Sequence, residues 1–209
     1  MLADNITVNV QSSIRIDGAK IVRFDPFQVS EAFHDADIIL LTHAHFDHLD
    51  PDSLVNVKKA DTVFVVPASM REEVREHVAG HTVHYLKPGD EIDIGPVHIK
   101  AVPAYNLNKP FHPKDNQWLG YVVTMDNVRY YAAGDTDAAD ELKRIACDVA
   151  MVPIGGTYTM IAPEAAALVN EIHPRVAIPI HYGSVVGSAE DAAEFQRLVA
   201  MDILVVKKL

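Results

Sequence analysis

The six residues 43–48 read His-Ala-His-Phe-Asp-His and place four imidazole or carboxylate side chains in one short stretch. The apolar run before them, residues 37–42, is typical of a fully buried strand. After them, Asp50 and Pro51 form a helix N-cap with proline at the first helical position. Burying so many ionisable groups without a cation is costly. The stretch therefore predicts a metal site, and imidazole with carboxylate suits zinc, iron or manganese.

The alternative for residues 43–48 is a satisfied polar turn whose histidines cap the next helix. If the chain stays extended, His43, His45 and Asp47 point to one side, and His48 follows as the chain turns. The density of ligand-type groups favours the metal site over the turn. One loop cannot complete two coordination spheres, so we expect further ligands from elsewhere in the chain.

Two later residues follow apolar strands and are candidate ligands. Asp135 stands in Gly-Asp-Thr after the predicted strand 128–132, and His181 follows the predicted strand 176–180. In open α/β sheets, sites lie at the carboxyl ends of strands. Taken alone, Asp135 suits a helix cap and His181 suits a loop. Beside residues 43–48, both indicate metal binding.

Short apolar runs alternate with turn signals along the chain of 209 residues. Antiparallel strands are predicted first, with a hairpin turn at Asp17-Gly18, and strand–helix alternation follows. Besides the helix after Asp50, we expect helices over residues 69–78, 138–146, 163–172 and 189–201. No Gly/Ser-rich linker divides the chain. We therefore expect one domain, residues 1–209, of mixed α/β class with helices outside.

Composition limits the classes of function. The chain has 18 Lys and Arg against 29 Asp and Glu, a net charge of -11, which argues against a binder of nucleic acid or anionic membranes. The single cysteine, Cys147, excludes an internal disulfide. No apolar run approaches the roughly 18 residues of a membrane span, and no secretory leader opens the sequence. We expect a cytoplasmic protein that acts on a small molecule, with homo-oligomerisation left open.

On these residues the chain resembles the metallo-β-lactamase superfamily, in particular its small cytoplasmic metal-dependent hydrolases. Residues 43–48 match the HxHxDH signature of that family. Asp135, in its Gly-Asp-Thr context, matches the carboxylate that bridges two metals, and His181 matches the final histidine. The resemblance implies a four-layer αββα sandwich, in which two mixed sheets pack face to face with helices on both outer surfaces.

The resemblance also implies two divalent metal ions in one cleft, with zinc expected and manganese or iron as alternatives. The implied ligands are His43, His45 and a third histidine for the first metal, Asp47, His48 and His181 for the second, and Asp135 as the bridge.

The third histidine departs from the family pattern. Residues 102–106 end in Asn106 where that histidine is expected, and an amide is a poor zinc ligand. His112, further along the same long loop, is the predicted replacement. If His112 is not a ligand, it faces the substrate or orients another ligand. The first metal then has an open coordination position or an amide ligand, and it binds more weakly.

Five residues near these positions are candidate substrate contacts. Gly155 and Gly156 follow a predicted strand, so their backbone N–H groups could approach a substrate anion, with Tyr158 as a further donor. A plain turn that uses glycine for its backbone angle is an equal alternative. Tyr105 and Asn106 are predicted to line the cleft from the long loop.

The implied activity is hydrolysis of a phosphodiester, lactone or other ester of a small substrate by a metal-bound hydroxide, because metals lower the pKa of water from roughly 15.7 to about 7. Asp47 and His112 are the predicted proton carriers, His112 only if it is not a ligand. Two alternatives stay open: an iron-dependent oxidoreductase such as a persulfide dioxygenase on the same fold, and a non-catalytic metal-binding or sensor protein.

Overall fold

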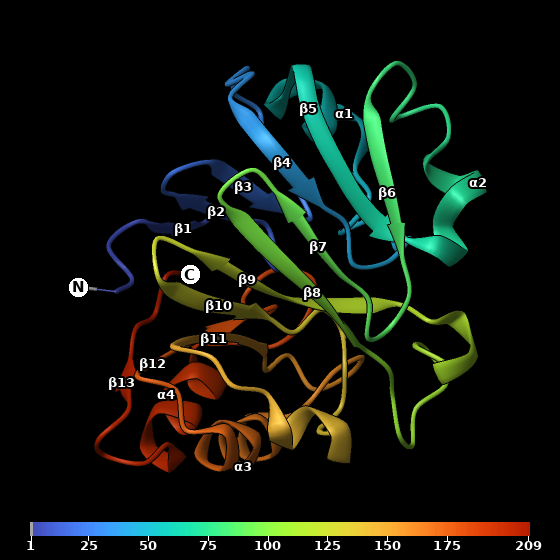
Figure 1. Ribbon diagram of the computed structural model, residues 1–209. Coiled ribbons are helices and arrows are strands. Elements are labelled where there is room, and N and C mark those ends of the chain that lie inside the picture. The colour runs from blue at the N-terminus through green and yellow to red at the C-terminus, as the bar shows by residue number, and fades with distance from the viewer. Residues whose placement is uncertain (1) are drawn as a thin grey trace.

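The computed structural model describes residues 2–209, so that of the predicted domain 1–209 only Met1 lies outside the described residues. Two mixed sheets form the centre of the molecule. Helices α1 (Pro51–Val57) and α2 (Arg71–Val74) lie outside the first sheet, and α3 (Ala162–Ile172) and α4 (Ala189–Leu198) lie outside the second (Figure 1). This confirms the predicted αββα fold.

The first sheet contains six strands in chain order, antiparallel from β1 to β3 and parallel from β3 to β6. Its strands are β1 (Ile6–Val8), β2 (Ile14–Asp17), β3 (Ile21–Phe24), β4 (Ala36–Leu40), β5 (Lys58–Pro67) and β6 (Thr82–Leu86). The turn at Asp17-Gly18 joins β2 to β3, as predicted.

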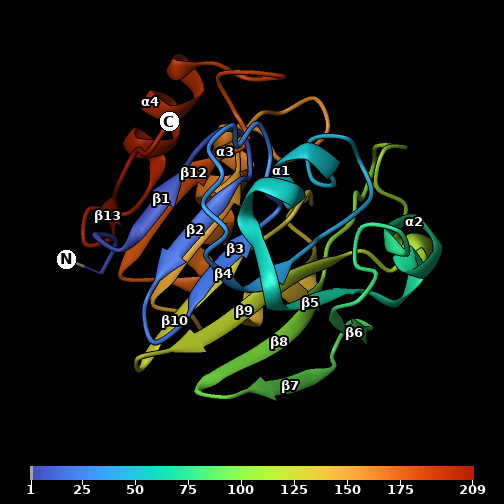
Figure 2. The same ribbon diagram turned by 90° about the horizontal axis from the view of Figure 1, so that it is seen from above.

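The second sheet contains seven strands, antiparallel from β7 to β10 and parallel from β10 to β13. Its strands are β7 (Glu91–Ile94), β8 (Val97–Pro103), β9 (Leu119–Met125), β10 (Val128–Ala132), β11 (Val149–Pro153), β12 (Val176–Ile180) and β13 (Leu204–Val205). Seen from above, the first sheet lies over the second (Figure 2).

Strand β4 and the residue after it show why residues 38–41, before the histidines, are apolar at four consecutive positions. Ile38 and Leu40 pack into the layer between the two sheets, whereas Ile39 and Leu41 pack against Leu54 of α1 on the outer side. A strand that is buried on both faces needs apolar residues on both, so it shows no polar alternation.

One predicted helix is confirmed only in part, and another is a 3₁₀ segment and not an α-helix. Residues 69–78 form only a 3₁₀ turn, Ala68–Met70, followed by the four residues of α2. Residues 138–146 form a 3₁₀ segment, Asp140–Arg144, in which Leu142 is the one buried side chain. Such segments bury too little apolar surface to offset the entropy of ordering a longer helix. The helices predicted over 163–172 and 189–201 are confirmed as α3 and α4, although α4 ends at Leu198.

The two sheets are tied together where β4 ends. The Tyr121 hydroxyl donates to the carbonyl of Leu41 at 2.7 Å, and the Leu119 N–H donates to the carbonyl of Thr42 at 3.1 Å. The chain leaving β4 therefore enters the cleft between the sheets. Within residues 2–209, none of the helices has the length and apolar character needed to cross a membrane.

Candidate metal centre

The segment after β4 turns back on itself instead of staying extended. The N–H groups of His48 and Leu49 both donate to the carbonyl of His45, each at 2.9 Å. The extended course predicted for residues 43–47 therefore ends at His45. The turn leads into α1, where the Asp50 side chain accepts from the Asp52 N–H, so the predicted N-cap is confirmed.

The structure brings all seven predicted ligand residues together: six form two groups of three, and Asp135 forms a further group with His43 and His48. In each group the candidate ligand atoms lie within 4.8 Å of one another; one group is His43, His45 and His112, and the other is Asp47, His48 and His181. Asp135 lies between the groups. Its Oδ2 is 3.3 Å from His112 Nε2 and 3.2 Å from His181 Nε2, and its Oδ1 is 3.4 Å from His48 Nε2.

The spacing of these atoms fits metal coordination. His43 Nε2 lies 3.1 Å from His45 Nδ1 and 3.4 Å from His112 Nε2. A tetrahedral zinc site with Zn–N distances of about 2.0–2.1 Å has ligand–ligand edges of roughly 3.3 Å. Within the described residues, the buried atoms His48 Nε2, Asp135 Oδ1 and His181 Nε2 have no hydrogen-bond partner. Because buried polar atoms are normally paired, the donor set fits a divalent cation.

Asp25 orients two of the histidines. Its buried carboxylate accepts from His48 Nδ1 at 2.7 Å and from the Thr42 hydroxyl at 2.6 Å. The Thr42 oxygen in turn lies 2.9 Å from His43 Nδ1. Acceptors at Nδ1 leave Nε2 of both rings free to face the centre. Our sequence reasoning missed Asp25; the available signal was an acidic residue directly after β3, the parallel neighbour of β4.

Asn106 orients His112 in a similar way. The Asn106 Oδ1 accepts from the backbone N–H of His112 at 3.0 Å and lies 3.1 Å from its Nδ1. The Asn106 Nδ2 donates to the carbonyl of Tyr158 at 2.9 Å. These contacts turn His112 Nε2 toward His43. The geometry therefore supports His112, and not Asn106, as the ligand that completes the first group.

The carboxylates and histidines shift one another's pKa values strongly. Burial alone would raise the pKa of Asp135, but His181 and His48 outweigh it and hold that pKa well below its usual range. Burial lowers the pKa of His181, yet Asp135 and Asp47 bring it to about 9. Burial, with His48 nearby, lowers the pKa of His43 well below its usual value. The site around Asp135 thus favours positive charge. A bound cation would take the place of the protons that the neighbouring histidines carry without it.

A cavity of about 220 Å³ opens directly onto this centre. Its lining residues are His45, Phe46, Asp47, Phe111, Asp135, Tyr158, His181 and Val185. Of the predicted substrate contacts, Tyr158 is in this lining. Sequence reasoning missed Phe46, Phe111 and Val185, although Phe46 and Phe111 each adjoin a predicted ligand in the sequence.

The other predicted substrate contacts lie differently. The Gly156 N–H donates to the carbonyl of Met160 at 3.1 Å, so it is not free for a substrate anion. Gly155 packs against His181, where an added Cβ would lie 2.4 Å from the His181 carbonyl oxygen. The hydroxyl of Tyr105 donates to Glu141 at 2.9 Å. Tyr105 and Trp118 line a separate cavity. The structure therefore does not bring Tyr105 to the mouth of the centre.

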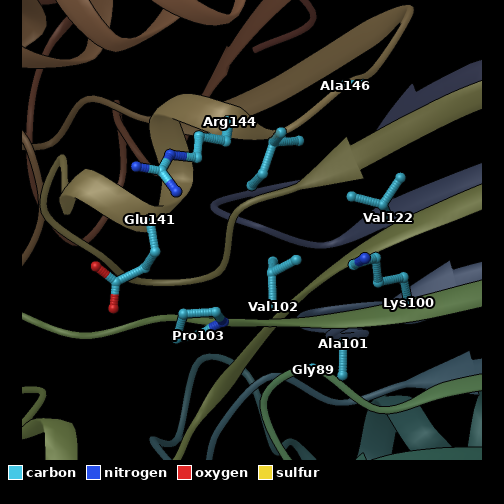
Figure 3. Close-up of a pocket in the computed structure, with 10 residues that line it drawn as sticks. Gly89, Lys100, Ala101, Val102, Pro103, Val122, Glu141, Arg144 and Ala146 are labelled. Carbon is cyan, nitrogen blue, oxygen red and sulfur yellow. The ribbon is translucent and has the colours of Figure 1, made fainter.

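A larger cavity of about 380 Å³ lies between β8 and the 3₁₀ segment Asp140–Arg144. Figure 3 shows Glu141 and Arg144 on that segment and Val102 on the facing sheet. None of the candidate ligands lines it. We therefore place the functional site at the smaller cavity, where the buried ionisable groups converge.

Replacing Asp25 by asparagine should weaken metal binding by about 10- to 100-fold, because the amide cannot accept all the hydrogen bonds that orient His48 and His43. The affinity is measured by competition with a chelator. Asp37→Asn is the matched control, since the Asp37 carboxylate binds the Ile21 N–H and Lys59 away from the centre. Equal affinities for Asp25→Asn and the parent would contradict the role given to Asp25.

Comparisons with known proteins identify the family of the chain. The profile of the beta-lactamase superfamily domain matches residues 5–182. The UPF0173 metal-dependent hydrolase of Pyrococcus horikoshii is 34% identical over 88% of this chain and 87% of its own. That of Pyrococcus furiosus is 32% identical over 96% and 94%. The crystal structure of a candidate metal-dependent hydrolase from Parabacteroides distasonis has a TM-score of 0.83 and 30% identity, covering 98% of this chain and 92% of that one.

Proposed function

The chain belongs to the beta-lactamase superfamily and, within it, to the UPF0173 metal-dependent hydrolases, and from that premise we propose that it hydrolyses an ester bond of a small substrate with two bound metal ions. The substrate that contains this bond is a carboxylic ester, a lactone or a phosphodiester. We take zinc as the metal, because nitrogen and carboxylate ligands at these spacings suit it.

The position of Asp135 is the observation that supports two metals. Its two oxygens lie within 3.4 Å of ligand nitrogens from both histidine groups, so one carboxylate can serve both sites. A mononuclear site would leave the second group, with its unpartnered His48 and His181 nitrogens, unexplained.

A divalent cation at this centre supplies an acidified water and polarises the oxygen that gains charge during hydrolysis. The protein's own contribution is to hold the donors and to move protons. We assign the proton transfer to a carboxylate oxygen of Asp47, because its side chain lines the cavity and is more exposed than that of Asp135, 8% against 3%. His112 Nε2 points into the ligand group, so we give His112 a ligand role and not a proton-carrying one.

Metal loading tests the proposal. Elemental analysis should give close to two metals per chain, and a strong chelator should abolish hydrolysis, which returns when zinc is restored. At a free metal concentration of 100 times Kd, each site should add about 2.7 kcal/mol to the free energy of unfolding. For a chain of this size that raises the melting temperature by roughly 5–10 °C. His48→Ala serves as the control that lacks one ligand. Full turnover by metal-free protein would overturn the proposal.

The same measurements address the oxidative alternative. These ligands would also accept iron. Protein that retains iron and consumes oxygen in the presence of a persulfide, while zinc-loaded protein cleaves no ester, would favour the oxidoreductase over the hydrolase.

A further inference from the structure

The cavity over the candidate metal centre has an apolar rim. Four of its lining residues are Phe46, Phe111, Tyr158 and Val185. Phe46 is 66% exposed, and Phe111 and Val185 are each 39% exposed. Exposed apolar side chains do not stabilise the free protein. A contiguous group of them around a cavity therefore indicates a binding surface.

Ring packing fixes the position of the rim phenylalanines. Phe46 packs edge-to-face on Phe27, with ring centroids 5.9 Å apart, and Phe111 packs in the same way on Tyr158 at 4.7 Å. One pair comes from the first half of the chain and the other from the second half. Rings held in this way offer a preformed apolar surface to a ligand.

The same rim lacks positive side chains. Neither Lys nor Arg is among the residues that line the cavity. The lysines of the long loop are engaged elsewhere: Lys109 Nζ contacts Asp137 Oδ1 at 2.5 Å, and Lys114 Nζ contacts Glu141 Oε1 at 3.0 Å. Proteins usually recognise phosphate and carboxylate groups with Arg or Lys. The mouth of the site therefore suits a neutral group.

We propose that the substrate is a neutral carboxylic ester or lactone with a small aromatic or branched apolar group beside the scissile carbonyl. This inference rests on the proposed function. The cavity volume of about 220 Å³ is below the roughly 300–1,000 Å³ of drug-sized sites, so the enclosed group is no larger than about one ring. In the reaction, the oxygen of water bonds to the acyl carbon and the bond from that carbon to the alkoxy oxygen breaks. One water proton goes to the leaving alcohol, and the acid loses the other.

The test compares the rates of the zinc-loaded 209-residue protein on p-nitrophenyl acetate, p-nitrophenyl phenylacetate, p-nitrophenyl succinate and bis(p-nitrophenyl) phosphate. The first three share a leaving group and differ only in the acyl side. We expect kcat/KM for the phenylacetyl ester to exceed that for the acetyl ester by about tenfold or more. The succinyl ester and the phosphodiester should be the poorer substrates. Preference for either anion would overturn the inference.

Rim variants make the test specific. Phe46→Ala should reduce about tenfold the ratio of kcat/KM for the phenylacetyl ester to kcat/KM for the acetyl ester. Val185→Lys should raise the rate with the succinyl ester, because it adds a cation at the rim. Phe33→Ala is the matched control, since Phe33 is also 39% exposed but lies beside Arg23 on another surface. Metal content is measured for each variant, and unchanged selectivity in both rim variants would contradict the inference.

A binding measurement separates this inference from the proposed function. If no compound of the panel is hydrolysed, the proposed function fails, and calorimetric titration with phenylacetamide, acetamide and phenyl phosphate still decides the nature of the rim. Tighter binding of phenylacetamide than of the other two, lost in Phe46→Ala, supports a neutral aromatic ligand. Tighter binding of phenyl phosphate contradicts it.

Discussion

Asparagine in place of Asp135 is expected to leave at most one metal per chain and to lower kcat/KM for ester hydrolysis on the order of 10³-fold. The change keeps the shape of the side chain but removes the charge shared by the two ligand groups. The metal pair supplies several kcal/mol of transition-state stabilisation, and each 1.36 kcal/mol is worth about tenfold in rate. Asp135 is buried among His48, His112 and His181, and asparagine keeps one oxygen there but loses the negative charge that faces both ligand groups.

Elemental analysis and initial rates on the best ester measure this effect. Asp148→Asn is the control, because Asp148 pairs with Arg129 just before β11, whereas Asp135 follows the adjacent strand β10 at its other end. That control should keep both metals. Circular dichroism of the Asp135→Asn protein verifies that it has folded. Two tightly held metals and near-parental turnover in that protein would exclude Asp135 as the bridge.

The ligand residues were accessible to sequence reasoning because their signals are local. Residues 43–48 hold four of these candidates in one turn, His181 follows β12 directly, and Asp135 comes three residues after the end of β10. The arrangement of parallel strands then brings these strand ends to one edge. His112 was harder to predict, since it sits in a loop without regular structure and owes its position to Asn106.

The parts that the sequence did not predict depend on long-range contacts. Asp25 orients His48, which is 23 residues further along the chain, and its position directly after β3 is the one local signal of that role. The charged segment 69–78 has residues that favour a helix, yet the sheet buries only Met70, Val74 and Val78 from it. Helix propensity is a weak term, and tertiary packing decides whether a short segment continues as a helix.

The backbone under His181 limits what can stand at position 155. His181 has a φ of 56°, in the left-handed region that few non-glycine residues adopt. Gly155 packs closely against it. An added Cβ there would lie 2.4 Å from the His181 carbonyl oxygen and 2.6 Å from Val186 Cγ2. Because the first of these atoms belongs to the backbone, the strand end that carries His181 has to move.

Gly155→Ala is therefore expected to lower the free energy of unfolding by about 1–3 kcal/mol and to release the metal held by Asp47, His48 and His181. For a chain of this length the melting temperature should fall by roughly 2–12 °C. Gly18→Ala is the control. Its Cβ would meet the side-chain ends of Asp126 and Met125, which can rotate away far from the centre. Calorimetry and metal analysis of both variants distinguish a general packing defect from displacement of a ligand. A Gly155→Ala protein that keeps two metals and the parental melting temperature would show that His181 tolerates a shifted backbone.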